Sequence, residues 1–238
     1  MLGRFLEFSI PTADIRASIE FYERLGFEQA QTRDVWSHPY AVLTDGRMTL
    51  GLHQDPAREL ALTFVHPEVA ERGAALERQG LELTYRRTGA ESFHEIGLED
   101  PSGQRIRIVE ARTYSPAPRA PTVTSLCGYF AELSLPATDF ESAARFWEPL
   151  GFVATELAEP YPRLLLTSDL LNLAFHAPRM LAGPALVFND QNMRERIAQL
   201  HDLGVPSKRK LPAGLDPAAD ALLQGPEGTV LLLLTEQP

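Results

Sequence analysis

Two glutamates, Glu7 and Glu132, are the residues of this sequence whose type and position are best suited to chemistry. Each lies in the middle of a short apolar segment, FLEFS at 5–9 and FAELS at 130–134. A half-buried strand would normally carry an apolar or small polar residue there, because a buried carboxylate without a partner is costly. We therefore expect each glutamate to meet either a partner side chain or a ligand.

A helix is predicted directly after each of these segments, at 14–27 and at 139–152. In the first, DIRASIEFYERLGF, apolar residues recur at spacings of four and three. Asp14 can cap its N-terminus and Gly26 can end it. The second, DFESAARFWEPLGF, repeats this pattern, and each of its residues follows its counterpart by 125 positions.

The side chains of a strand alternate between its two faces, so the helix can cover only one set of them. Leu6 and Phe8 would meet the helix. Phe5, Glu7 and Ser9 would then face the other side of the sheet. The first glutamate is thus predicted to lie on the face that the helix leaves open.

Three further strands are predicted after the first strand and helix, and this βαβββ pattern occurs four times. The second half keeps the register of the first, since His53 corresponds to His176 and Gly103 to Gly228. We predict an α+β protein with two tandem modules of two units each, at 1–113 and 126–238. Three prolines mark 114–125 as an extended linker between the modules. The expected strands of the first module, after its first strand, lie at about 27–34, 40–44, 49–53, 60–65, 82–88, 91–98 and 105–109.

The composition limits the class of protein. A formal charge of −10 with interspersed charges argues against a nucleic-acid partner, and no apolar run is long enough to span a bilayer. Cys127 is the single cysteine, which excludes intramolecular disulfides. We expect a cytoplasmic protein with a small-molecule partner, present as a monomer or a homodimer.

Aromatic and basic side chains near the first glutamate's side of the sheet are further candidates for a site. Trp36, His38 and Tyr40 cluster at the entry to a strand, where they could contact a planar ligand or simply pack in a loop. In the penultimate strand either His94 or its neighbour Glu95 must face the same side as Glu7.

The order and duplication of these motifs resemble the vicinal oxygen chelate superfamily, which includes glyoxalase I, extradiol dioxygenases, fosfomycin-resistance enzymes and bleomycin-binding proteins. The resemblance covers nearly the whole chain. It implies that each sheet of the two glyoxalase/bleomycin-resistance-like modules is mixed and curls into a cup. In the enzymes of the family, a divalent metal lies in the cup on residues of the first strand, the fourth or fifth strand and the last strand.

Most of these metal positions carry residues that cannot bind a metal. The first-strand positions are Glu7 and Glu132, but the other matched positions carry residues without a suitable donor: Gly51, Ala174, Leu60, Ala185, Arg107 and Leu232. His53 and His176 lie two residues beyond the fourth-strand positions and share their face. Two donors per cup do not make a metal site, so we expect no cofactor, with a divalent metal as the alternative.

Two hypotheses for function follow from the resemblance. In the first, the protein binds a planar or aromatic ligand in a metal-free cup, through residues drawn from both modules: Trp36, Tyr40, His94, Arg107, Glu132, Arg163 and His176. In the second, it is a glyoxalase-like or dioxygenase-like enzyme for a carbonyl or catechol substrate, with Glu7 and His53 at the catalytic site. Arg107 and His53 are the expected partners of Glu7, and Arg163 is a candidate partner of Glu132.

Overall fold

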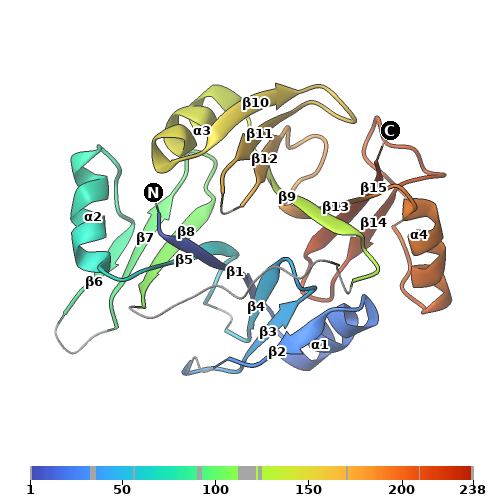
Figure 1. Ribbon diagram of the computed structural model, residues 1–238, viewed down its shortest axis with the longest axis horizontal. Helices are drawn as coiled ribbons and strands as arrows, with labels where there is room; N and C mark the ends of the chain where they lie inside the picture. Colours follow the sequence, from blue (N-terminus) through green and yellow to red (C-terminus); the bar gives the residue numbers. More distant parts are fainter. Residues whose placement is uncertain are drawn as a thin grey trace.

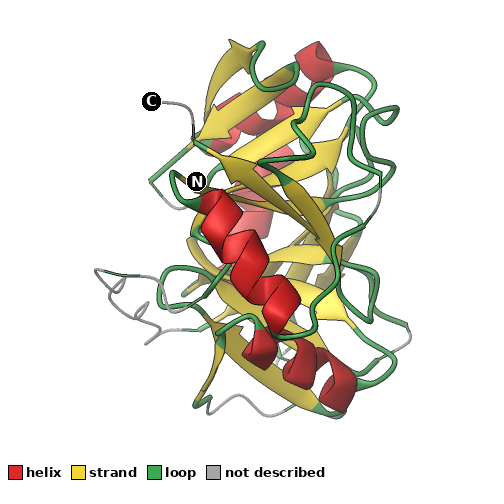
Figure 2. Cartoon of the chain, turned by 90° about the vertical axis from the view of Figure 1, so that its right-hand side faces the viewer, coloured by secondary structure: helices red, strands yellow, loops and turns green. Residues whose placement is uncertain are grey.

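Two mixed β-sheets make up the protein, one from each half of the chain (Figure 1). The computed structural model describes residues 2–32, 36–55, 57–89, 93–111, 122, 125–169, 171–208 and 210–236. The predicted linker, 114–125, lies almost entirely outside the described residues, and the domain boundaries stay a prediction. Seen from the side, the helices lie against the strand layers (Figure 2).

The first module forms a sheet with eight strands in its described residues, in the order β2-β3-β4-β1-β5-β8-β7-β6. Two pairings, β1 with β4 and β5 with β8, are parallel, and β1 and β5 join the two units as antiparallel neighbours. Its elements are β1 (Arg4–Pro11), α1 (Ile15–Arg24), β2 (Glu28–Ala30), β3 (Tyr40–Thr44), β4 (Thr49–His53), β5 (Ala61–His66), α2 (Val69–Arg78), β6 (Tyr85–Arg87), β7 (Glu95–Glu99) and β8 (Arg105–Glu110).

The second module forms a sheet with seven strands in its described residues, in the order β10-β11-β12-β9-β13-β15-β14. Among the described residues between α4 and β14 there is no strand, so the fourth unit has two strands after its helix where the prediction has three. The α+β fold with two tandem mixed sheets is confirmed. The elements are β9 (Tyr129–Pro136), α3 (Phe140–Trp147), the 3-10 turn η1 (Glu148–Leu150), β10 (Val153–Leu157), β11 (Arg163–Thr167), β12 (Leu173–His176), β13 (Ala185–Asp190), α4 (Met193–Asp202), β14 (Ala221–Gln224) and β15 (Val230–Thr235).

A bulge near the start of β1 corrects one expectation about the faces of this strand. Phe5 pairs with Phe64 and Glu7 with Thr63, so two steps along β1 match one step along β5. The ring of Phe5 therefore packs on Phe8, with centroids 4.9 Å apart, instead of sharing the face of Glu7. An equivalent register shift occurs in β9. In both strands the bulge places a phenylalanine in the core and the next glutamate on the opposite face.

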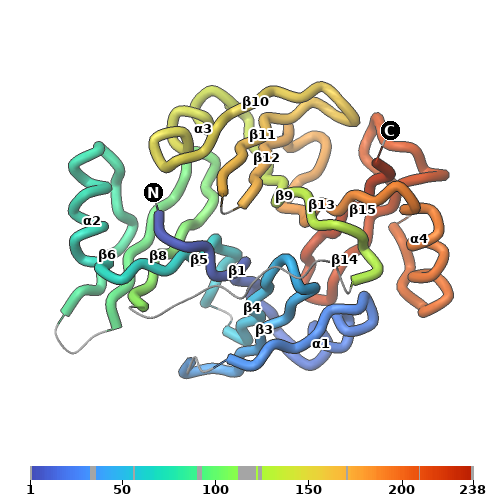
Figure 3. Tube along the Cα trace, viewed as in Figure 1, coloured from blue at the N-terminus to red at the C-terminus, as the bar shows by residue number. Residues whose placement is uncertain are grey.

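The helix-facing sides of the two sheets meet in one continuous core. Phe8 of β1 and Phe130 of β9 touch there, with ring centroids 5.5 Å apart. Because Glu7 lies on the other face of β1 from Phe8, and Glu132 on the other face of β9, the two cups open away from the contact between the modules. Figure 3 shows the first half of the trace on one side and the second half on the other.

Two reciprocal hydrogen bonds join the modules through the repeated motifs. Tyr22 of α1 donates its hydroxyl to Glu227 Oε1 at 2.7 Å, and Trp147 of α3 donates its indole N–H to Asp100 Oδ2 at 3.0 Å. Tyr22 and Trp147 occupy the same place in the two helices, and both acceptors lie in the matched turns before β15 and β8. The motif residues thus act in the contact between modules.

Candidate functional site

The side chain of Glu7 is buried in the first cup, with 1% of its surface exposed, and both carboxylate oxygens have partners. Oε1 accepts from Ser9 Oγ at 2.7 Å and from His53 Nε2 at 3.0 Å, and Oε2 accepts from the Tyr40 hydroxyl at 2.5 Å. Burial alone would raise the pKa of Glu7, but the hydrogen bonds and charge of His53, together with Tyr40 and Ser9, hold this pKa below its ordinary value. The expected pairing of Glu7 with His53 is confirmed, and the carboxylate stays ionised.

Glycine at position 51 makes room for this carboxylate. A Cβ atom on Gly51 would lie 2.1 Å from Oε2 and 2.3 Å from Oε1 of Glu7. Gly51 is the fourth-strand position at which relatives of the fold are expected to carry a ligand to a metal. In this protein the carboxylate of Glu7 occupies the space that such a side chain would need.

A chain of polar side chains runs from Glu7 toward the surface. Nδ1 of His53 lies 2.9 Å from Nε2 of His38, and Nδ1 of His38 lies 3.8 Å from Oδ2 of Asp55. Since Glu7 is a carboxylate, Nε2 of His53 must donate to it, and in the second hydrogen bond either Nδ1 of His53 or Nε2 of His38 is the donor. Burial, followed by the charge of Arg58, lowers the pKa of His38. The arrangement connects a buried carboxylate with a half-exposed one through two imidazoles.

Trp36 and Tyr40 pack around these imidazoles. The ring of Trp36 lies 5.1 Å from that of His53 and 5.7 Å from that of Tyr40, measured between centroids. The guanidinium of Arg58 lies 4.4 Å above the Trp36 ring. The predicted aromatic cluster is therefore assembled, and it supports the hydrogen-bonded chain and one arginine.

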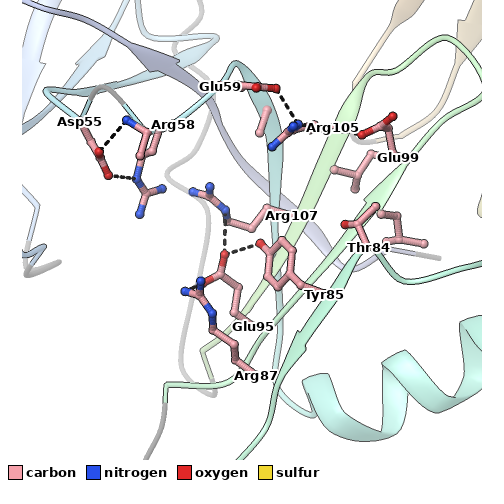
Figure 4. Close-up of a pocket in the computed structure, with 14 residues that line it drawn as sticks. Asp55, Arg58, Glu59, Thr84, Tyr85, Arg87, Glu95, Glu99, Arg105 and Arg107 are labelled. Atoms are coloured by element: carbon pink, nitrogen blue, oxygen red, sulfur yellow. Dashed lines mark hydrogen bonds and ion pairs between the residues drawn. The ribbon is translucent and has the colours of Figure 1, made fainter.

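An open cavity of about 470 Å³ lies beside this chain, over the second unit of the first module (Figure 4). Tyr85, Glu95 and Arg107 come together in it from β6, β7 and β8. Nε of Arg107 lies 2.9 Å from Oε1 of Glu95, and the Tyr85 hydroxyl donates to the same oxygen. Burial, then the hydrogen bond to Glu95, raises the pKa of Tyr85 to about 12. A Cβ atom on Gly97 would lie 2.2 Å from the Tyr85 ring, so this glycine leaves room for the tyrosine.

The expected partnership of Arg107 with Glu7 is wrong. Thr63 of β5 lies between them in the register, opposite Glu7 on one side and Arg107 on the other. Two strand spacings separate the backbones by about 10 Å, and Arg107 forms its ion pair with Glu95.

His94, which directly precedes β7, and Glu95, the first residue of β7, point to opposite faces of the sheet. Nδ1 of His94 lies 2.7 Å from Oε2 of Glu110, whereas Glu95 lines the cavity. Sequence reasoning missed Arg58 and Tyr85 of this cavity, and it left His94 and Glu95 as alternatives. The alternation of β7 relative to β8 could have identified Glu95, but Arg58 lies in a loop that has no periodic pattern.

Glu132 is buried in the second cup beside Arg163, whose Nε lies 3.0 Å from Oε1, as expected. Burial outweighs this pairing and raises the pKa of Glu132. His176, the other possible donor of the second cup, makes its hydrogen bonds elsewhere. Nδ1 of His176 accepts from Ser134 Oγ at 2.7 Å, and Nε2 donates to the Leu181 carbonyl at 3.0 Å. Burial lowers the pKa of His176, and the hydrogen bond to the Leu181 carbonyl opposes this shift only in part.

Apolar side chains fill much of the second cup. Leu232 stands at the position that corresponds to Arg107 and is fully buried together with Val187, and Leu215 from the segment after α4 packs over them. With this cover, the four leucines of β15, at 231–234, are buried on both faces of the strand. A cavity of about 400 Å³ remains at the edge of the cup, lined by both charged and apolar residues that include Glu132 and Arg163.

The residues present do not fit the divalent metal that the resemblance implies. Among the described residues, no group of three or more His, Cys, Asp or Glu side chains is arranged to hold a metal ion. In the first cup both oxygens of Glu7 are engaged by hydrogen-bond donors, and the last-strand position carries the cation of Arg107. In the second cup the corresponding positions are apolar. None of the described helices is long and apolar enough to cross a membrane.

Comparison with solved structures shows extensive similarity to dioxygenases. A catechol 2,3-dioxygenase has a TM-score of 0.58 at 16% identity, covering 98% of this chain and 92% of its own. The 2,3-dioxygenase LapB from Pseudomonas sp. KL28 has a TM-score of 0.63 at 13% identity, with 99% and 92% covered. A homoprotocatechuate 2,3-dioxygenase mutant from Brevibacterium fuscum has a TM-score of 0.62 at 17% identity, with 99% and 72% covered.

Neither a protein-family model nor a curated protein matches the sequence. The similarity therefore lies in the fold and not in the sequence. Only 13–17% of the residues are identical, although the aligned region covers nearly all of this protein. The chain therefore has the two-module fold of these dioxygenases.

Proposed function

We propose that this protein binds a small planar organic molecule in the cup of its first module, without a divalent metal. The observation that carries the proposal is the cavity of about 470 Å³ beside Tyr85 and Arg107. Ligand pockets commonly measure about 300–1,000 Å³ and combine an apolar or aromatic wall with a few polar groups. Tyr85 supplies the aromatic wall, and Leu98 and Ile106 add apolar surface.

The hydrogen-bond partners of the residues that could bind a metal, Glu7 and His53, support a site without a metal. Glu7 and His53 bind each other, and the side chains around them donate hydrogen bonds to the carboxylate. A cation at this place would have to displace those donors and tolerate Arg107 on the same face of the sheet. The polar network instead holds the floor of the cup in one geometry.

The proposal can be tested with protein treated with EDTA and titrated with planar aromatic fragments, with binding followed by ligand-observed NMR. We expect binding that EDTA leaves unchanged and that Thr84→Trp blocks, because Thr84 is exposed at the rim of this cavity. Glu236→Trp, at the exposed rim of the second cavity, is the matched control and should bind normally. Binding that survives Thr84→Trp but not Glu236→Trp would move the site to the second module.

A second candidate function is a dioxygenase-like or glyoxalase-like activity, with Glu7 and His53 as the acid–base residues. The similarity of the fold to catechol dioxygenases favours it. Turnover of catechols and of hemithioacetals with Fe, Mn, Ni and Zn supplied in turn is the test. Activity that depends on one metal and disappears in Glu7→Gln would replace the proposal of a metal-free cup.

A further inference from the structure

The cavity of the first module has hydrogen-bond donors that lack acceptors. Some buried side-chain polar atoms of the described residues that line the cavity have no hydrogen-bond partner. All of them are guanidinium nitrogens of Arg58 and Arg107. Nε of each arginine faces a carboxylate as an ion pair, but Nη1 of each has no such partner among the described residues. A buried donor left in this state costs free energy unless a ligand or water supplies an acceptor.

The carboxylates around the cavity are already engaged. Asp55 accepts from the backbone N–H of Ala57 and pairs with Arg58, and Glu95 accepts from Tyr85 and pairs with Arg107. At the rim, Glu59 and Glu99 both face Arg105. The groups deep in the cavity that can still form hydrogen bonds are therefore donors.

The two guanidinium groups are held close together despite their like charge. Figure 4 shows them on the same side of the cavity, and the charge of Arg107 adds to burial in lowering the pKa of Arg58. Contact with the ring of Trp36 fixes Arg58, and the ion pair with Glu95 fixes Arg107. Two fixed cations that repel each other form a site for an anion placed between them.

Resting on the function proposed above, we infer that the ligand of this cavity carries a carboxylate, which lies between the Nη1 atoms of Arg58 and Arg107. The planar guanidinium fork matches the planar carboxylate. A phosphate monoester, with about −1.5 to −2 charges, would be repelled more strongly by Asp55 and Glu95 at the same place. The aromatic wall at Tyr85 then favours an aromatic acid.

Benzoate, its neutral isostere benzamide and phenyl phosphate are suitable probes for calorimetry and NMR on the full chain. We expect benzoate to bind more tightly than benzamide by roughly tenfold, which corresponds to about 1.4 kcal/mol. Phenyl phosphate should bind more weakly than benzoate. Added salt should weaken benzoate binding and leave benzamide unaffected.

Arg58→Gln and Arg107→Lys test the assignment of residues. Arg107→Lys keeps a positive charge beside Glu95 while removing the planar pair of donors, so it protects the fold of β7 and β8. Each variant should weaken benzoate binding by roughly tenfold and change benzamide binding little. Arg194→Gln, at the rim of the second cavity, is the matched control and should bind benzoate as the unmodified protein does.

Several results would overturn the inference. Equal binding of benzoate and benzamide, tighter binding of phenyl phosphate, or benzoate binding that persists in both arginine variants would each do so. If neutral aromatic fragments bind in the first cup while benzoate does not, the inference fails and the proposed function stands. If no fragment of either kind binds there, both fail.

Discussion

The two modules place a glutamate at the same point of the same strand and surround it differently. In the first cup, Glu7 lies among hydrogen-bond donors and the neighbouring cavity is lined by arginines. In the second, Glu132 has one arginine partner, and leucines occupy the last strand.

Opposite pKa shifts record this difference, since the pKa of Glu7 is lowered and that of Glu132 is raised. Two copies of one scaffold can thus carry different chemistry, because the helices and turns set the fold while a few inward-facing positions set the charge of each cup.

Exchanging the last-strand residues tests the comparison most severely. Leu232→Arg would bury a guanidinium among Val187 and Leu215, where no carboxylate pairs with it at the same place, so we expect a loss of more than about 3 kcal/mol of unfolding free energy. The reciprocal Arg107→Leu should cost about 1–2 kcal/mol, because Glu95 retains the Tyr85 hydroxyl. Urea unfolding measures both. Equal costs would mean that the two cups are not distinguished by their polarity.

The two cups differ in the size of the residue at the fourth-strand position. Gly51→Ala should cost about 2–3 kcal/mol, because its Cβ would lie 2.1 Å from the Glu7 carboxylate. The matched position in the second cup is already Ala174. Gly183→Ala is a suitable control because its Cβ would meet no atom within 4 Å, and its effect should stay within about 0.5 kcal/mol. A fully stable Gly51→Ala protein, as judged by thermal unfolding, would show that the carboxylate does not lie over β4.

The pH dependence of stability should have opposite signs for the two glutamates. The lowered pKa of Glu7 contributes stability that is present above the unfolded value of 4.5 and is lost as the pH falls through the folded pKa. The raised pKa of Glu132 contributes stability that is present below the unfolded value and is lost as the pH rises through the folded pKa.

Glu7→Gln should therefore flatten the acid side of the stability profile, and at neutral pH it should cost about 2 kcal/mol. In the unmodified protein, the stability contributed by Glu132 is lost as the pH rises above 4.5. Glu132→Gln should remove this loss. Urea unfolding over a series of pH values measures both slopes. Slopes of the same sign in the two variants would contradict the comparison of the two carboxylates.

The reciprocal hydrogen bonds between the modules give the smallest expected effect. Tyr22→Phe removes the donor to Glu227 while keeping the buried ring, and it should lower the unfolding free energy by about 1 kcal/mol. Thermal unfolding would detect this change. Arg16→Gln, on the exposed side of the same helix, should have almost no effect. A similar loss in both variants would indicate a change in helix stability instead of a lost contact between modules.

Much of the fold and part of the site could be predicted from the sequence. The strands at 40–44 and 49–53 match β3 and β4, because alternation and the Asp45-Gly46 turn are local signals. The contact of Glu7 with His53 and that of Glu132 with Arg163 also follow the prediction. Phe5 was assigned to the wrong face, since a bulge depends on how two strands pair and leaves no trace in the pattern of one of them.

The sequence by itself determined the order of elements, the duplication and the two mid-strand glutamates, since these depend on short-range periodicity and on a constant offset. Only the tertiary structure decided which charges meet in the cavity of the first module. It brought Arg58 from a loop to Arg107 of β8, paired Arg107 with Glu95, and laid the segment after α4 over the second cup. Each of these contacts joins residues from different strands or loops, so strand register and side-chain packing determine them.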